Sequence, residues 1–149
     1  MTDADQLIGR NLQFRQCYTA ILALPEPERT RKANRYLACI REKHTINERV
    51  WAAMQSGSSG TSMPGGLAGA QAAFRKFAGA LDTAFPGTFT RRQLSTAMWS
   101  DGTVTFRGER FPLRTGMDAA DYLSAIAADR AGVLAPLGTV RGFKEWLRA

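Results

Sequence analysis

The pattern of apolar and polar positions predicts a helical first part of the chain. We expect one helix from a cap at Asp3 or Asp5 to the Leu24–Pro25 step, because the residue before a proline disfavours helical geometry. A broad apolar face at helical spacing supports it, formed by Leu7, Ile8, Leu12, Phe14, Tyr18, Ile21 and Leu22.

A second helix is predicted from Pro27, which suits a first helical turn. The apolar pattern weakens at His44, and Thr45 with Glu48 has the spacing of a capping box, in which each side chain covers the other's exposed amide. We therefore expect a break or kink at His44 and a short new helix that carries Val50 and Trp51.

Residues 55–66 are rich in Gly and Ser, uncharged and without apolar period, which indicates a loop or linker. A phosphate-binding loop is a poor alternative, because the segment lacks the Gly and Lys spacing that such loops share. Beyond it, Phe74, Phe77 and Leu81 mark one face of a helix that ends at Pro86.

A short helix from Thr90 to about Trp99 follows, with Thr90 and Gln93 as a second capping box. The one strong strand signal is the alternation of Val104, Phe106, Phe111 and Leu113, which predicts a β-hairpin at about 103–114 with one apolar face.

Pro112 has no amide to donate across the hairpin. We therefore expect Phe106 to face Phe111 across a four-residue tip, Arg107–Arg110, with the second strand at an edge, where proline is tolerated. This arrangement would expose Arg107 and Arg110 at the tip.

The rest of the chain predicts a helix capped by Asp118 to about Ala131, a Gly/Pro-bearing loop and a short last helix with Phe143 and Trp146. The fold class is mainly α with a small antiparallel β-hairpin (α+β). Its parts are a helical segment at 1–54, the Gly/Ser-rich linker or loop at 55–66, and helices with the hairpin at 67–149.

Composition adds a strong basic bias to this fold. The 149 residues include 20 Lys and Arg against 13 Asp and Glu, a net charge of +7, and arginine predominates. This bias is typical of planar recognition of phosphate or carboxylate, and equally of a GC-rich genome, which enriches arginine too. We find no apolar run that could span a membrane and no basic, apolar leader, so we expect a cytoplasmic protein.

Few residues offer catalytic chemistry. His44 is the only histidine, and Cys17 and Cys39 match no metal or redox spacing, so we expect two reduced core thiols, although a disulfide between the first two helices stays open. Carboxylates in a cleft between the halves are the one enzymatic alternative, and we expect no two acids to converge in a pocket. We therefore predict no enzyme, no cofactor and no metal site.

Two basic clusters are the candidate binding residues, for nucleic acid or an acidic protein surface. One lies on the second helix and the other spans the short helix and the hairpin. Their members are Arg31, Lys32 and Arg35, and Arg91, Arg92, Arg107, Arg110 and Arg114. The sequence leaves open whether the clusters share a face, and Trp99 and Phe89, which adjoin the second cluster, also fit the core.

A short helix followed by a basic hairpin resembles the helix-plus-wing arrangement of winged helix-turn-helix modules over roughly residues 67–131, although no separate recognition helix fits between Trp99 and Thr103. We expect a small non-enzymatic binding or regulatory protein that contacts DNA or RNA. The alternative is a protein-binding adaptor or inhibitor, such as a bacterial or phage-encoded effector, that uses the same arginines with aromatic anchors.

Overall fold

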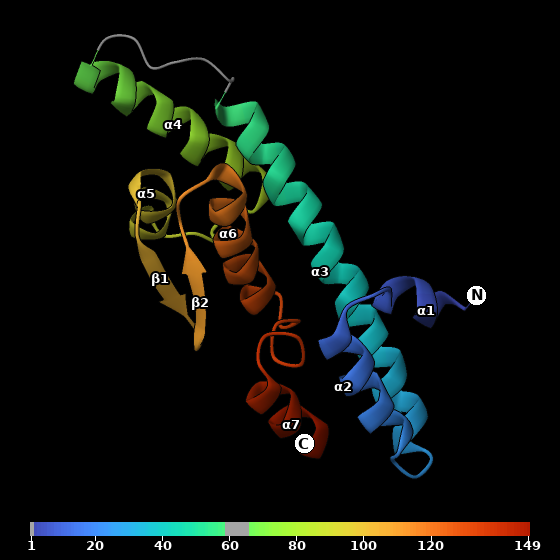
Figure 1. The fold of residues 1–149 in the computed structure, drawn as a ribbon. Coiled ribbons are helices and arrows are strands. Elements are labelled where there is room, and N and C mark those ends of the chain that lie inside the picture. Colours follow the sequence, from blue (N-terminus) through green and yellow to red (C-terminus); the bar gives the residue numbers. More distant parts are fainter. Residues whose placement is uncertain (1, 59–65) are drawn as a thin grey trace.

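The computed structural model describes residues 2–58 and 66–149, which form seven helices and one two-stranded antiparallel sheet (Figure 1). The fold is thus mainly helical with a small β-hairpin, as the sequence predicts. In chain order the elements are α1 (Asp3–Ile8), α2 (Leu12–Leu22), α3 (Glu28–Ser58), α4 (Gly66–Ala84), α5 (Arg91–Trp99), β1 (Thr103–Phe106), β2 (Glu109–Pro112), α6 (Gly116–Arg130) and α7 (Val140–Arg148).

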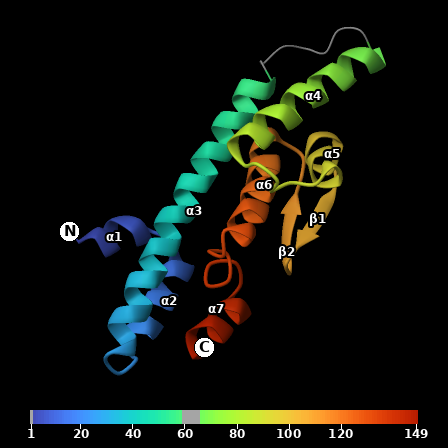
Figure 2. The same cartoon turned by 180° about the vertical axis from the view of Figure 1, so that it is seen from behind.

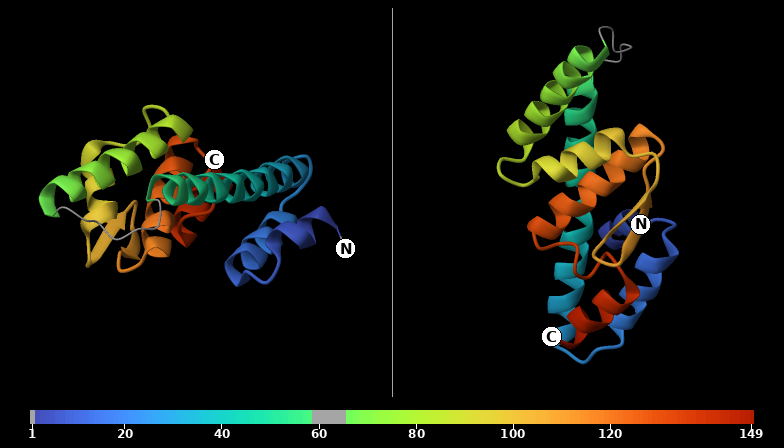
Figure 3. Two further views of the ribbon diagram at one scale, coloured as in Figure 1. Left: turned by 90° about the horizontal axis from the view of Figure 1, so that it is seen from above. Right: turned by 90° about the vertical axis from the view of Figure 1, so that its left-hand side faces the viewer.

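The long helix α3 is the axis around which the other elements are arranged. Viewed from the side, α4, α5, the hairpin and α6 surround its C-terminal half, whereas α1, α2 and α7 lie at its N-terminal half (Figure 3). The view from behind shows the same division (Figure 2). Residues from both halves nevertheless contribute to one cluster of buried side chains.

The N-terminal segment forms two helices, where one was predicted. Gly9 ends α1 with a positive φ of 54°, and the side chain of Asn11 caps α2 by accepting from the amide of Phe14 at 3.0 Å. Thr2, rather than Asp3 or Asp5, caps α1, and Asp5 completes the capping box.

The predicted break at His44 is wrong, since α3 runs without interruption from Glu28 to Ser58. The hydroxyl of Thr45 donates back to the carbonyl oxygen of Arg41 at 3.2 Å and does not cap a new helix. Ile46 and Val50 are buried and continue the apolar stripe through the suspected break, where α3 packs against α6. Tertiary packing therefore overrides a local capping signal.

The predicted linker is partly helical. Residues 55–58 belong to the last turns of α3, and Gly66 begins α4, while residues 59–65 of the prediction lie outside the described residues. Gly57 permits the close approach of α4, because a Cβ at this position would lie 3.0 Å from the Cα of Phe77. One predicted loop glycine is thus a helix-packing residue.

Two further helix starts test the capping predictions. The Thr90–Gln93 box at the start of α5 is confirmed, with both reciprocal hydrogen bonds present. At α6 the cap is Thr115, whereas Asp118, the predicted cap, is its partner three residues later. A capping box thus starts α6, with its cap three residues before the predicted one.

The hairpin exists where it was predicted, but its register differs. Val104 pairs with Phe111 and Phe106 with Glu109, so the tip has two residues, Arg107 and Gly108, instead of four. Both have positive φ, at 53° and 82°, as a tight type I′ turn requires.

The shifted turn also accommodates Pro112. This residue pairs with Thr103, and the amide of the next residue, Leu113, donates to the carbonyl oxygen of Gly102 at 2.7 Å. Pro112 therefore occupies a position of the ladder that needs no amide donor. The four-residue tip was expected for the same reason, but the two-residue turn already meets this requirement.

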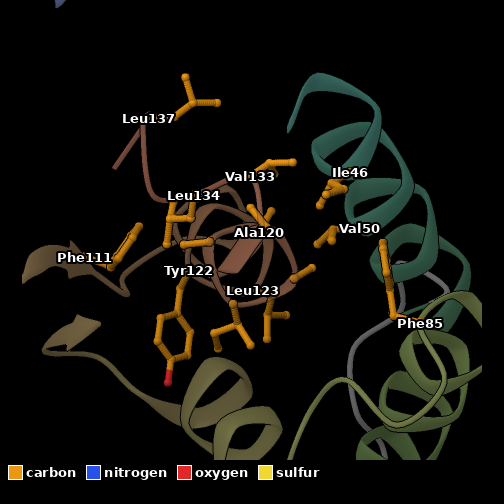
Figure 4. Packing of buried hydrophobic residues seen from close by; sticks show 14 of the residues in the cluster. Ile46, Val50, Phe85, Phe111, Ala120, Tyr122, Leu123, Val133, Leu134 and Leu137 are labelled. Atoms are coloured by element: carbon orange, nitrogen blue, oxygen red, sulfur yellow. The ribbon is translucent and has the colours of Figure 1, made fainter. Parts of the chain in front are cut away.

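Helix α6 is the centre of the core. Its residues Ala119–Ala128, except Asp121, are buried between α3 on one side and the hairpin on the other (Figure 4). Phe111 reaches the ring of Tyr122 at 5.9 Å between centroids, and Phe106 reaches it at 6.5 Å. The apolar face of the hairpin thus packs inward, and the opposite face, which carries Arg110, is exposed.

Candidate functional site

The two predicted arginine clusters do not form one stripe. Arg31 and Arg35 are exposed near the start of α3, whereas Arg91 and Arg92 are exposed on α5, which lies beside the far half of that helix (Figures 1 and 3). A continuous basic track along the molecule is therefore not formed, and each cluster must be considered separately.

Lys32 does not belong to the exposed surface of its cluster. The residue is only 9% exposed, and its Nζ donates to the main-chain oxygens of Trp146 at 2.8 Å and Ala149 at 3.2 Å. The same ammonium lies 4.5 Å from the centroid of the Trp146 ring. Its charge is directed into contacts with α7, so the prediction of Lys32 as a partner-binding residue is corrected to a structural role.

The hairpin arginines are also dispersed. Arg107 at the tip pairs with Asp129 of α6 at 3.3 Å, which ties the tip to the domain. Arg110 lies within β2, opposite Thr105, rather than at the tip where it was expected. Arg114 follows β2 and lines a cavity beside α6. A freely extending basic wing is thus absent from the described hairpin.

A different grouping of arginines is found between α4 and α5. A groove of about 730 Å³ is lined there by residues of both helices, and we call it the α4–α5 groove. It brings two guanidinium groups next to aromatic and apolar side chains. The lining residues used below are Arg75, Arg91, Phe74, Trp99 and Leu67.

The aromatic residues of this groove are held in a fixed stack. Phe74, buried on α4, lies 4.8 Å from Trp99 between ring centroids, with an interplanar angle of 28°. The guanidinium carbon of Arg91 lies 5.3 Å from the centroid of the same Phe74 ring. Phe74 therefore positions both a cation and an indole at the surface.

Trp99 and Arg75 are the residues that sequence reasoning underestimated. Trp99 fitted a core position, but it is 48% exposed at the last residue of α5, where its ring stacks on Phe74. Arg75 was assigned to no cluster. Its place next to Phe74, on a helix with a clear apolar face, is enough to predict that Arg75 is exposed. It does not predict that α5 packs beside this residue.

A second charged group lies where α3, the hairpin and α6 meet, with Lys43 and Glu109 half-buried and Asp121 exposed. Burial raises the pKa of Glu109 and of Asp121, and the charge of Lys43 partly opposes both shifts. Burial in turn lowers the pKa of Lys43, whose Nζ donates to Asn47 Oδ1 at 3.1 Å. The shortened tip places Glu109 on the inward face of β2, where the sequence had placed it outside.

Three carboxylates, from β2, α6 and α7, line one cavity of about 480 Å³: Glu109, Asp129 and Glu145. From the sequence we expect no two acids to converge in a pocket, and a shared lining does not by itself bring these three carboxylates together. Asp129 is already paired with Arg107. No group of three potential ligands suited to a metal ion occurs among residues 2–58 and 66–149.

Both cysteines, Cys17 and Cys39, are buried and free. None of the helices in the described part of the chain is long and apolar enough to cross a membrane.

The chain matches no model of a known protein family, no curated protein and no solved structure. The candidate function therefore depends on the α4–α5 groove itself.

Proposed function

We propose that this protein binds single-stranded nucleic acid in the α4–α5 groove. The observation that carries the proposal is the exposed indole of Trp99, stacked on Phe74 and flanked by two arginines in one groove. Aromatic platforms beside cations are the common means of binding single strands, because every base offers a ring face and every nucleotide a phosphate. The net charge of +7 adds long-range attraction.

A single strand fits better than a duplex. Contact with a duplex over its length would need arginines aligned along one face, and the two clusters lie at opposite halves of α3. Arg107 at the hairpin tip is paired with Asp129, which competes with the backbone contact that winged-helix modules make through the wing. A short unpaired segment needs only one stacking residue and one or two phosphate contacts, and the α4–α5 groove offers these.

Each residue has a role under this proposal. Trp99 would stack on a base, a contact worth about 1–3 kcal/mol. Arg75 and Arg91, which are exposed and form no ion pair with any residue that the structure describes, would contact neighbouring phosphates. Arg92 lies next in sequence, where it would add charge without lining the groove.

Fluorescence anisotropy with labelled single-stranded DNA, single-stranded RNA and duplex DNA tests the proposal, at salt concentrations from about 50 to about 200 mM. We expect the single strands to bind more tightly than the duplex, with an affinity that falls as salt rises. Trp99→Ala should weaken binding about tenfold or more. Arg75→Ala/Arg91→Ala should also lower the slope of log affinity against log salt by about 1.4, for two phosphates.

The matched control is Arg31→Ala/Arg35→Ala, which removes the same charge from two exposed positions at the other half of α3. An equal loss in the two double variants would show that only the net charge matters. Absence of binding at the lowest salt would exclude the proposal.

The alternative partner is an acidic protein surface, with the chain acting as an adaptor or inhibitor. Leu67, which is 76% exposed at the edge of the same groove, favours it, because an apolar side chain adds more to a protein contact than to a phosphate backbone. A stoichiometric partner that is captured from nuclease-treated lysate and lost in Leu67→Ser would support this alternative over nucleic acid.

A further inference from the structure

A further cavity, of about 440 Å³, lies on another side of α5, and its position is independent of the proposed function. It is bounded by the last turns of α3, by α4, by α5 and by the start of α6, and we call it the Trp51 cavity. This volume is within the range of small-molecule sites in proteins. Trp51, which is 37% exposed, stands at its edge.

The inner wall of the Trp51 cavity is apolar. Phe77 and Leu113 are almost completely buried behind it, and two methionines from different helices, Met54 and Met98, line the same space. Methionine side chains adapt their shape to an apolar guest more readily than branched residues do. The wall is therefore suited to a flexible hydrocarbon chain.

Small residues explain why the cavity is not filled by the protein itself. Each of the helices α4, α5 and α6 presents an alanine to it, at Ala73, Ala97 and Ala119. Gly116, the first residue of α6, also lines it, and a Cβ built there would meet no atom within 4 Å. Four helices meet here without a large side chain from these positions to close the space.

The rim of the cavity is polar and carries one cation. Arg114 lines it, and its guanidinium forms no ion pair within the described chain. Ser100 Oγ accepts from the amide of Gly102 at 3.3 Å, which leaves its hydroxyl proton for another acceptor. No Asp or Glu is among the lining residues. The rim thus favours an anionic group over a neutral or cationic one.

We propose that the Trp51 cavity binds a small amphiphilic carboxylate, with its hydrocarbon chain against Met54, Met98 and Phe77 and its carboxylate at Arg114. Burial of the chain supplies the affinity, and the guanidinium supplies the selection for an anion. Trp51 reports binding, because a ligand in the cavity changes the environment of its indole.

Isothermal titration calorimetry with four probes tests this assignment: octanoate, octanol, octylamine and acetate. We expect octanoate to bind about tenfold more tightly than octanol, as a charge-assisted hydrogen bond implies, octylamine to bind more weakly than octanol, and acetate not to bind. Octanoate should change the tryptophan fluorescence of the wild type, and Trp51→Phe should remove most of that change.

Two variants separate the carboxylate contact from the apolar one. Arg114→Gln should reduce octanoate binding to the level of octanol while octanol binding persists. Ala73→Leu should fill the cavity from α4 and weaken both ligands.

The probe series on the wild type decides the question even where a variant fails to fold. Equal binding of octanoate, octanol and octylamine would overturn the assignment of an anion site. Failure of octanoate and octanol to bind at all would overturn the cavity as a ligand site. Neither result bears on nucleic-acid binding, which is measured at the α4–α5 groove.

Discussion

Lys32 on α3 donates a hydrogen bond of 2.8 Å to the carbonyl oxygen of Trp146 on α7 and lies 4.5 Å from the centroid of that residue's ring. The two residues are 114 positions apart in the chain. The rings of Phe143 and Trp146 lie within about 6 Å of Tyr36, one helical turn beyond Lys32. A side chain that composition would count as surface charge thus fastens the last helix to the longest one.

Replacement of this lysine should destabilise the fold without affecting nucleic-acid binding. Lys32→Met keeps the length of the side chain but leaves two main-chain oxygens without their donor and removes the cation–π contact, at a cost of about 1–3 kcal/mol in the free energy of unfolding. Urea denaturation measures this loss. Arg31→Ala, one residue away and exposed, is the control and should stay within about 0.5 kcal/mol of the wild type. Unchanged stability of Lys32→Met would contradict the structural role.

Two threonines with the same sequence signature should respond differently to alanine. Thr90→Ala removes a real capping box from α5 and should cost about 1 kcal/mol. Thr45→Ala lies inside α3, where alanine is the better helix former, and should be neutral or slightly stabilising. Thermal or urea unfolding of both variants makes the comparison. A loss at Thr45 equal to that at Thr90 would indicate that a helix does begin there.

Alanine substitution of Gly108 tests the hairpin turn, and the same substitution of Gly79 in α4 serves as the comparison. Gly108 has a φ of 82°, which a residue with a Cβ adopts only under strain, so Gly108→Ala should lower the free energy of unfolding by about 1 kcal/mol. Gly79 lies in α4 with open space around the position of a Cβ, so Gly79→Ala should raise it by about 0.5–1 kcal/mol. The four-residue tip that we first expected does not require Gly108 to be the second of two turn residues. A neutral Gly108→Ala would therefore favour that tip.

Two carboxylates with raised pKa values, the half-buried Glu109 and the more exposed Asp121, should make stability depend on pH. Burial raises the pKa of Glu109 and of Asp121, so the folded protein holds their protons more tightly than the unfolded chain does. Their contribution to stability is complete below the ordinary carboxyl pKa of about 4 and is lost as the pH rises through the folded-state values.

Glu109→Gln removes one of these groups and should stabilise the protein at pH 7 relative to the wild type, with the difference disappearing towards pH 4. Urea unfolding at the two pH values measures the effect, and the exposed Glu42→Gln is the control. A variant that is less stable than the wild type at pH 7 would show that the attraction between Glu109 and Lys43 outweighs the burial of the carboxylate.

The sequence by itself determined what depends on neighbouring residues. The capping box at Thr90 and the buried face of Phe74, Phe77 and Leu81 follow from spacing within one helix, because the helical period alone decides which side chains share a face. Alternation likewise placed Val104, Phe106 and Phe111 on the inward face of the hairpin. The structure confirms this shared face, although Phe111 pairs with Val104 and not with Phe106.

Only the tertiary structure decided which local signals prevail. Thr45 and Glu48 have the spacing of a cap, but Ile46 and Val50 pack on the core, and their burial keeps α3 continuous. Lys32 is buried because α7 returns to it, a contact between segments that no local pattern encodes.

The candidate site has the same origin. Trp99 and Arg75 lie on different helices, and the packing of α4 against α5 brings them to one groove. A sequence period predicts the face of each helix, whereas the partner of that face is fixed by how the helices meet.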